Sequence, residues 1–232
     1  MDPDVTRGAA ASFYLCDFDG TVARADVGNQ FFTRFIRDEA AHRALLEHWF
    51  AEDMGGREIL AGECALAEVD EAEALDFADR WNAIDPHFAA FVAAARARGS
   101  DAAIASDGLL LYIRRILDSH GLEDVGASAN GLVFDGRHIT PVFGSPEGEG
   151  CGLCGSCKGA VLARRAKGYA RTVFIGDGLS DRCGARAADV VYAKGDLTAW
   201  CARAGIAALP YATFADIAAA EGLALSATLE RS

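Results

Sequence analysis

The spacing of apolar residues changes several times along the chain, and each spacing predicts a different kind of element. Residues 12–18 form a short apolar run that ends in acids and a glycine, as a buried strand does when it meets a loop. Between residues 26 and 85, apolar pairs such as Phe31/Phe32 recur at helical spacing. Pro86 marks the end of this stretch, because proline disfavours a helical residue before it. We therefore expect one strand followed by a long helical segment.

Beyond this proline the pattern alternates between strands and helices. Gly99 and Gly121 stand at the ends of two apolar-rich stretches, where helices commonly stop. Apolar and polar residues alternate on both sides of Asp135-Gly136, which predicts a β-hairpin over residues 131–142. The predicted helices cover residues 88–98, 109–120, 158–167, 180–187 and 197–204, and the predicted strands cover 102–105, 172–175 and 190–192.

Alternating strands and helices favour an α/β fold in which helices cover both faces of a parallel sheet. The long helical segment interrupts this alternation directly after the first strand. We therefore predict an α/β core made of residues 1–24 and 87–232, with residues 25–86 inserted as a helical cap.

Charge and composition exclude several classes of function. The chain carries 22 Lys+Arg and 34 Asp+Glu, a net charge of −12, which argues against nucleic acid or an anionic membrane as a partner. No apolar run reaches the roughly 18 residues that span a bilayer, and residues 1–12 lack the apolar segment of a secretory signal. We expect a cytoplasmic protein whose seven cysteines are thiols or metal ligands. For the oligomeric state, the sequence is compatible with both a monomer and a homodimer.

Ligands of parallel α/β sheets bind beyond the carboxyl ends of the strands, and two acids stand at such a position here. Asp17 and Asp19 follow the first strand, and Gly20 allows a tight turn after them. One such carboxylate can attack phosphorus, while the other protonates a leaving oxygen and later activates water. The alternative is a solvated turn without a catalytic role.

Three further groups of polar residues follow predicted strands or loops. Asp177 and Asp181 could hold Mg²⁺, which prefers oxygen ligands, although Ser180 or Asp181 could equally cap the next helix. Ser106 could bind an anion together with backbone N–H groups, or act only as a helix cap. Lys158 could neutralise a phosphate and orient the nucleophile, or be an ordinary surface lysine.

The order of these groups resembles that of the haloacid dehalogenase superfamily of phosphatases. The chain has Asp-x-Asp-Gly-Thr, then a serine after the second core strand, then a lysine, then Gly-Asp-Gly-x-x-Asp. The resemblance implies a Rossmann-like core with a parallel sheet, and an inserted helical cap of the phosphoserine-phosphatase-like branch. It also implies hydrolysis of a phosphomonoester through an aspartyl-phosphate intermediate, with Mg²⁺ as cofactor.

The resemblance also implies roles for individual residues. Asp17 would be the nucleophile and Asp19 the general acid and base. Mg²⁺ would be bound by Asp17, the backbone carbonyl of Asp19 and Asp177, with Asp181 supporting it from nearby. The substrate is expected to contact Ser106, Lys158, Thr21 and Asp107. Asp26 and Arg57 are further candidates because of their position in the cap, and the alternative is that both are solvated surface residues.

Three cysteines precede the candidate lysine at two-residue gaps. Cys151, Cys154 and Cys157 have the spacing of zinc ligands, and His138, Cys183 or another distant residue would have to supply the fourth. The alternative is a reduced loop without metal. A cysteine-rich loop before this lysine resembles the 2-hydroxy-3-keto-5-methylthiopentenyl-1-phosphate phosphatases of methionine salvage and the phosphocholine/phosphoethanolamine phosphatases. Segments beyond it favour the former: Ala187-Ala-Asp189-Val, Tyr192-Ala-Lys194, Trp200-Cys201 and Leu209-Pro-Tyr211-x-x-Phe214.

The sequence thus predicts a Mg²⁺-dependent phosphatase that acts on a small phosphorylated metabolite. The candidates are the methylthiopentenyl phosphate, phosphoserine, a phosphocholine- or phosphoethanolamine-type ester, and pyrophosphate. Asp107 stands where the branch often has a second glycine, and Ser180 where many phosphoserine phosphatases have asparagine, which leaves the substrate open. A hypothesis of another class is an interaction module, in which the cysteines bind zinc and the aspartates are structural.

Overall fold

The computed structural model describes residues 11–81, 83–146 and 148–225, so the ends of the predicted core, 1–10 and 226–232, lie outside it. The described chain forms a seven-stranded sheet in the order β4-β3-β2-β1-β5-β6-β7. Neighbouring strands run parallel except for the antiparallel pair β3 and β4. The strands are β1 (Ser12–Cys16), β2 (Asp101–Leu109), β3 (Gly126–Asp135), β4 (His138–Val142), β5 (Arg171–Gly176), β6 (Val190–Ala193) and β7 (Ala208–Pro210).

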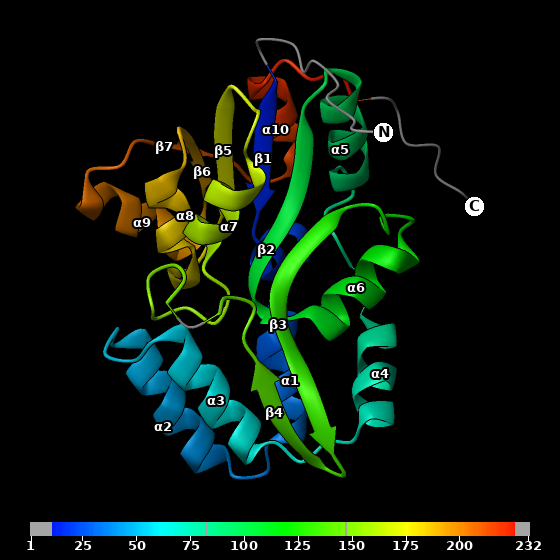
Figure 1. Ribbon diagram of the computed structural model, residues 1–232, viewed down its shortest axis with the longest axis vertical. Helices are drawn as coiled ribbons and strands as arrows, with labels where there is room; N and C mark the ends of the chain where they lie inside the picture. Colours follow the sequence, from blue (N-terminus) through cyan, green and yellow to red (C-terminus); the bar gives the residue numbers. More distant parts are fainter. Residues whose placement is uncertain (1–10, 82, 147, 226–232) are drawn as a thin grey trace.

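Helices cover both faces of this sheet, and β1 shows why. Successive side chains of a strand point to opposite faces, so Tyr14 and Cys16 pack on one side while Phe13 and Leu15 pack on the other. The first side is covered by α5 (Phe88–Ala97), α6 (Leu110–Ser119) and α10 (Phe214–Ala220), and the second by α7 (Lys158–Arg165), α8 (Arg182–Ala187) and α9 (Gly195–Ala204). The predicted α/β fold with a parallel sheet is confirmed (Figure 1).

The predicted helical segment after β1 forms four helices. They are α1 (Val27–Phe35), α2 (Glu39–Phe50), α3 (Gly56–Leu66) and α4 (Glu71–Arg80). Figure 1 shows α2 and α3 on one side of the β3–β4 hairpin and α4 on its other side. Apolar side chains of α1, α3 and α4 join the same continuous core as the α5–α6–α10 side of the sheet. We keep the division into a core and a cap of residues 25–86 as a proposal.

The hairpin follows its sequence prediction, whereas the end of β2 does not. Asp135 pairs with His138, and Gly136 takes the positive φ of +59° that a tight hairpin turn needs. The sequence predicts that β2 stops before Ser106 and leaves helix capping as the alternative to anion binding for this serine. Instead, after an irregularity beyond Ala105, the strand regains its pairing with β3 at Leu109. The helix α6 begins one residue later without a side-chain cap, so the capping alternative is wrong.

Two short elements near the carboxyl terminus, β7 and α10, are not apparent from the apolar pattern. β7 contributes only three residues, too few for a clear periodicity, and α10 is packed through the buried Phe214 and Ile217. None of the helices in the described segments combines the length and the apolar character that crossing a bilayer would require.

Candidate active site

A cavity of about 530 Å³ lies where the carboxyl ends of β1, β2 and β5 face the helices α1 to α3. The sheet side of its wall is polar and carries the acids that follow β1 and β5. The helical side is mainly apolar. Residues of the sheet side are Asp17, Asp19, Ser106, Asp107, Asp177 and Ser180, and residues of the helical side include Asp26, Phe32, Leu46, Trp49, Phe50, Ile59, Leu60 and Glu63.

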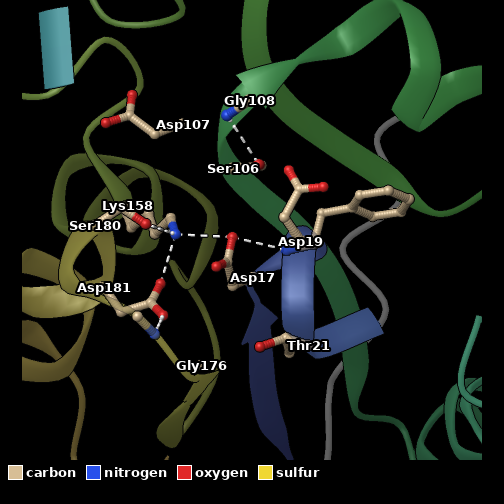
Figure 2. A network of polar contacts seen from close by, with 12 residues as sticks. Asp17, Asp19, Thr21, Ser106, Asp107, Gly108, Lys158, Gly176, Ser180 and Asp181 are labelled. Carbon is tan, nitrogen blue, oxygen red and sulfur yellow. Dashed lines mark hydrogen bonds and ion pairs between the residues drawn. The ribbon is translucent and has the colours of Figure 1, made fainter. Parts of the chain in front are cut away.

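Lys158, the first residue of α7, is fully buried next to this cavity. Its Nζ lies 2.7 Å from Asp17 Oδ1 and 2.5 Å from Asp181 Oδ1, and it donates to Ser180 Oγ at 2.9 Å (Figure 2). Burial alone lowers the pKa of the ammonium, but the charges of the two aspartates outweigh it and raise this pKa above its usual value. The side chain therefore keeps its positive charge, and the surface-lysine alternative is wrong.

Asp181 uses both carboxylate oxygens to hold the surrounding protein. Oδ1 faces Lys158, while Oδ2 accepts hydrogen bonds from the backbone N–H groups of Asp177 (2.8 Å) and Gly178 (2.9 Å). The alternative, a side-chain cap on α8, is absent from the described structure: neither Ser180 nor Asp181 makes one. Asp181 therefore fixes both the lysine and the loop after β5.

Asp17 lines the cavity, and one of its two carboxylate oxygens is held by the protein. Oδ1 accepts the N–H of Phe18 at 2.7 Å and faces Lys158. In Figure 2, no hydrogen bond or ion pair joins Oδ2 of Asp17 to the other residues drawn. Burial, then the charge of Asp181, raises the pKa of Asp17, while Lys158 opposes this rise. A ligand that brings positive charge would therefore favour the ionised carboxylate.

Asp177 brings a second carboxylate to the same point. Its Oδ1 accepts the hydroxyl of Thr21 at 2.6 Å. Gly20 has a φ of +71°, and a Cβ there would lie 2.3 Å from Asp177 Oδ2, so both the turn and the close approach require glycine. One oxygen each of Asp17, Asp177 and Asp181 lie within 4.8 Å of one another. This set of hard oxygen donors fits Mg²⁺.

Asp19 is held beside these groups by the start of α1 and by α6. Oδ1 accepts the N–H groups of Val27 (2.9 Å) and Gly28 (3.3 Å), and Oδ2 accepts the hydroxyl of Tyr112 at 2.6 Å. Burial, then the charge of Asp26, raises the pKa of Asp19 to about 7. Near neutral pH the carboxyl can therefore both give and take a proton.

The other predicted residues differ in how they face the cavity. Ser106 is buried in its wall, and its Oγ accepts the N–H of Gly108 at 3.0 Å. Asp26 lies at the exposed rim and caps α1. Arg57 does not line the cavity: its guanidinium donates to the carbonyl of Ser145 and lies over the Phe143 ring, 4.4 Å from the centroid.

Asp107 lines the cavity, but its carboxylate is directed into the cysteine-rich loop. Oδ1 accepts the N–H of Ser156 at 2.8 Å and lies 3.3 Å from Asn130 Nδ2. Oδ2 is buried and has no hydrogen-bond partner among the described residues. Burial raises the pKa of this carboxyl. Its geometry suits holding the loop better than contacting an anion.

Some residues at the site give no signal in the sequence. Tyr112 lies on the apolar face of α6, where it reads as an ordinary core residue until its contact with Asp19 is seen. Tyr211 stands out in the sequence only through a resemblance and without a role, yet its Oη lies 3.4 Å from Thr21 Oγ1. Glu63 and His42, both buried in the helical segment, face each other at 3.0 Å.

The structure also completes the candidate zinc ligands. The sulfur atoms of Cys151, Cys154, Cys157 and Cys183 all lie within 4.8 Å of one another. Of the fourth ligands considered from the sequence, Cys183 joins the group, whereas His138 is not part of it. A hydrogen bond from the Cys154 thiol lowers the pKa of Cys183 to about 5.

Comparisons with known proteins agree with this arrangement. The sequence model of the haloacid dehalogenase-like hydrolases matches residues 14–186. The 2-hydroxy-3-keto-5-methylthiopentenyl-1-phosphate phosphatase of Exiguobacterium sibiricum is 31% identical, over 88% of this chain and 93% of that protein. The enzyme of the same name from Brevibacillus brevis is 31% identical, over 87% of this chain and 89% of its own length.

A solved structure shows the same fold. It is a phospho-aspartyl intermediate analogue of phosphoserine phosphatase, with a TM-score of 0.69 and 20% identity. The alignment covers 91% of this chain and 99% of the other. At this identity the likeness concerns the fold alone.

The Glu63–His42 pair gives a prediction about pH. Burial, then the charge of Asp26, raises the pKa of Glu63 to about 8, and burial lowers that of His42, so both are neutral at pH 7. A raised carboxyl pKa stabilises the fold at low pH, and this contribution is lost as the pH rises through about 8. We expect the free energy of unfolding to fall by about 2–3 kcal/mol between about pH 6 and 9 because of this group.

Urea unfolding of the wild type and of Glu63→Gln at both pH values measures this contribution. In Glu63→Gln, the free energy of unfolding should fall much less between the two pH values than in the wild type. In Glu47→Gln, on the exposed side of α2, it should fall as much as in the wild type. Equal declines in the wild type and Glu63→Gln would contradict the assignment of a neutral Glu63.

Proposed function

The chain belongs to the haloacid dehalogenase-like hydrolases, and from this we propose that it is a Mg²⁺-dependent phosphatase of a small phosphorylated metabolite. The observation that carries the proposal is the buried ammonium of Lys158 between Asp17 and Asp181, at the polar end of a cavity with an apolar opposite wall. The hypothesis of a non-enzymatic zinc module is not kept, since the family is one of enzymes.

Asp17 is the proposed nucleophile. Its Oδ2 attacks phosphorus, so that a bond forms between this oxygen and phosphorus while the ester bond to the leaving oxygen breaks. Lys158 holds Oδ1 and thereby sets the direction of the free oxygen. Bound Mg²⁺, held by Asp17, Asp177 and the backbone carbonyl of Asp19 with Asp181 behind them, would neutralise charge on the phosphoryl oxygens.

Asp19 is the proposed acid and base. In its protonated form it gives its proton to the leaving oxygen, and the resulting carboxylate then takes a proton from water. That water attacks the phosphorus of the acyl phosphate on Asp17, which breaks the bond between Asp17 Oδ2 and phosphorus, releases inorganic phosphate and restores the carboxylate of Asp17. A pKa of about 7 suits both steps at neutral pH.

The remaining polar residues bind phosphate or position the catalytic groups. We assign Ser106 and Lys158 to the phosphoryl group, because Ser106 lines the polar end of the cavity and Lys158 is buried beside it in contact with Asp17. Thr21 positions Asp177 through its hydroxyl. Asp107 positions the cysteine-rich loop through the N–H of Ser156.

The apolar wall supports 2-hydroxy-3-keto-5-methylthiopentenyl-1-phosphate as the substrate, the ester named for the relatives at 31% identity. Leu46, Trp49, Phe50, Ile59 and Leu60 line the side of the cavity opposite the acids. A thioether leaving group could bury its apolar end there, whereas a fully polar one would lose hydration without gaining partners.

A second candidate rests on the two acids in the same wall. Asp26 and Glu63 line the cavity near these apolar residues, and an ionised carboxylate there would attract an ammonium group. This favours phosphoserine or a phosphocholine- or phosphoethanolamine-type ester. Because the pKa of Glu63 is raised to about 8, it offers little charge at neutral pH, so we place this candidate second.

Hydrolysis of a panel of these esters and of pyrophosphate, with Mg²⁺ and with a chelator, tests the proposal. We expect Mg²⁺-dependent release of phosphate. The kcat/KM for the methylthiopentenyl ester should be about tenfold or more above that for the amino esters, because the loss of one apolar contact lowers kcat/KM by about this factor. The reverse order would favour the second candidate. No Mg²⁺-dependent hydrolysis of any ester would contradict the proposed function.

Replacement of the nucleophile is the most direct mutational prediction. Asp17→Asn keeps the shape of the side chain but removes its nucleophilic charge, so kcat should fall by about 10³-fold or more. Circular dichroism should show an unchanged fold. Asp38→Asn, at the exposed cap of α2, should keep near wild-type activity. Wild-type turnover by Asp17→Asn would exclude the mechanism.

Thr21→Val should weaken Mg²⁺ binding rather than chemistry. The change keeps the volume but removes the hydrogen bond to Asp177, which is worth about 1 kcal/mol, so the Mg²⁺ concentration for half-maximal rate should rise about fivefold. The kcat at saturating Mg²⁺ should change little. Thr33→Val, exposed on α1, is the matched control. An unchanged Mg²⁺ dependence would show that Thr21 does not position the metal site.

A further inference from the structure

Four thiols meet outside the catalytic cavity, at a place that the phosphatase chemistry does not use. Cys151, Cys154 and Cys157 come from the loop before α7, and Cys183 comes from the first turn of α8. All four sulfur atoms lie within 4.8 Å of one another. A tetrahedral zinc ion with Zn–S bonds of about 2.3 Å separates its sulfurs by about 3.8 Å, so small side-chain movements would complete such a site.

The group is better suited to one shared ion than to disulfides. All four cysteines are free, and their four sulfurs gather around one point instead of forming two separate pairs. Cys151 is exposed while Cys157 is buried, so an ion can reach the group from solvent and still be shielded on its inner side.

The surroundings also suit the charge that such a site would carry. Zinc with four thiolates has a net charge of −2. Arg182 and Arg186 line the same surface cavity as Cys151, Cys154 and Cys183, and Arg182 already favours the thiolate form of Cys183. Arg182 is also paired with Glu52 of the same lining, so the two guanidinium groups would offset part of the negative charge.

We propose that Cys151, Cys154, Cys157 and Cys183 bind one structural Zn²⁺ ion. Four Zn–S bonds form, and each thiol loses its proton to solvent. No sulfur changes its oxidation state. With four protein ligands no position is left for substrate, as in other structural zinc sites.

The position of the ligands in the chain indicates what the ion would do. Cys157 directly precedes Lys158, and Cys183 follows Asp181 by two residues, so two of the ligands flank the two partners of the buried ion pair. The helices α7 and α8 are already in close contact, since a Cβ on Gly159 would lie 2.8 Å from the carbonyl of Cys183. The ion would hold the starts of both helices together and thereby fix the position of Lys158. This positioning role rests on the proposed function, whereas the binding of zinc does not.

The same loop also reaches the helical segment. The N–H of Arg57, in α3, donates to the carbonyl of Leu153 at 2.9 Å. A fixed loop would therefore hold one wall of the cavity as well as the lysine.

Metal analysis of the purified, reduced full chain tests the proposal without any substrate. We expect one zinc per chain after exhaustive dialysis, and, after exchange with Co²⁺, the visible absorption of tetrahedral cobalt with thiolate charge transfer. Cys154→Ser and Cys183→Ser should lose most of the bound metal. Cys201→Ala, buried in α9 outside the cluster, should keep it.

Three results would overturn the proposal. The first is a folded, reduced wild type that stays metal-free with excess Zn²⁺. The second is a disulfide among the four cysteines that persists in the native protein under reducing conditions. The third is full zinc retention by both serine variants. If the serine variants do not fold, the cobalt spectrum of the wild type decides. A zinc-loaded protein without phosphatase activity would contradict the proposed function alone, and an active zinc-free protein would contradict only the zinc site.

Discussion

The buried ion pair of Lys158 with Asp17 and Asp181 is the interaction on which the rest of the site depends. Removing an ammonium from water costs several kcal/mol, and short contacts to two carboxylates offset that cost here. The pair also leaves a surplus of negative charge: Asp17, Asp177 and Asp181 carry three negative charges when ionised, against one positive charge on Lys158. Burial, then Asp181, raises the pKa of Asp177 to about 6, which reflects this surplus. A divalent cation would balance it, so the acidic chain is compatible with a phosphate ester as substrate.

The fold brings these charges together through strand order. β1 and β5 are parallel neighbours at the centre of the sheet, so Asp17 and Asp177, which follow them, emerge at the same edge although they are distant in sequence. The start of α7 supplies the lysine, and the turn Leu179–Asp181 supplies its second partner. The loop before α7 then joins this polar end to the helices that form the opposite wall of the cavity. In the proposed function, one wall of the cavity would bind the phosphoryl group and the other would contact the leaving group.

Sequence reasoning succeeds where local pattern and chain order carry the information. Asp17, Asp19, Asp177 and Lys158 stand in motifs whose spacing and order are visible without a structure, and the alternation of strands and helices predicts the sheet that joins them. It fails where a role depends on contacts between distant elements. Nothing near Tyr112 indicates its bond to Asp19, and nothing near Arg57 indicates that Ser145 and Phe143 hold it away from the cavity. The sequence left open whether Ser106 caps a helix, because the resumed pairing of β2 with β3 cannot be seen in the apolar pattern.

The central claim is that Asp17 takes the phosphoryl group before water does. Rapid acid quench of the wild type with an excess of ³²P-labelled substrate, followed by peptide mapping of the denatured protein, tests it most directly. The account predicts acid-stable label on the peptide that contains Asp17, released by hydroxylamine as expected for an acyl phosphate. Release of labelled phosphate in the steady state, with no label on the protein at any quench time and with Asp17→Asn still active, would contradict it.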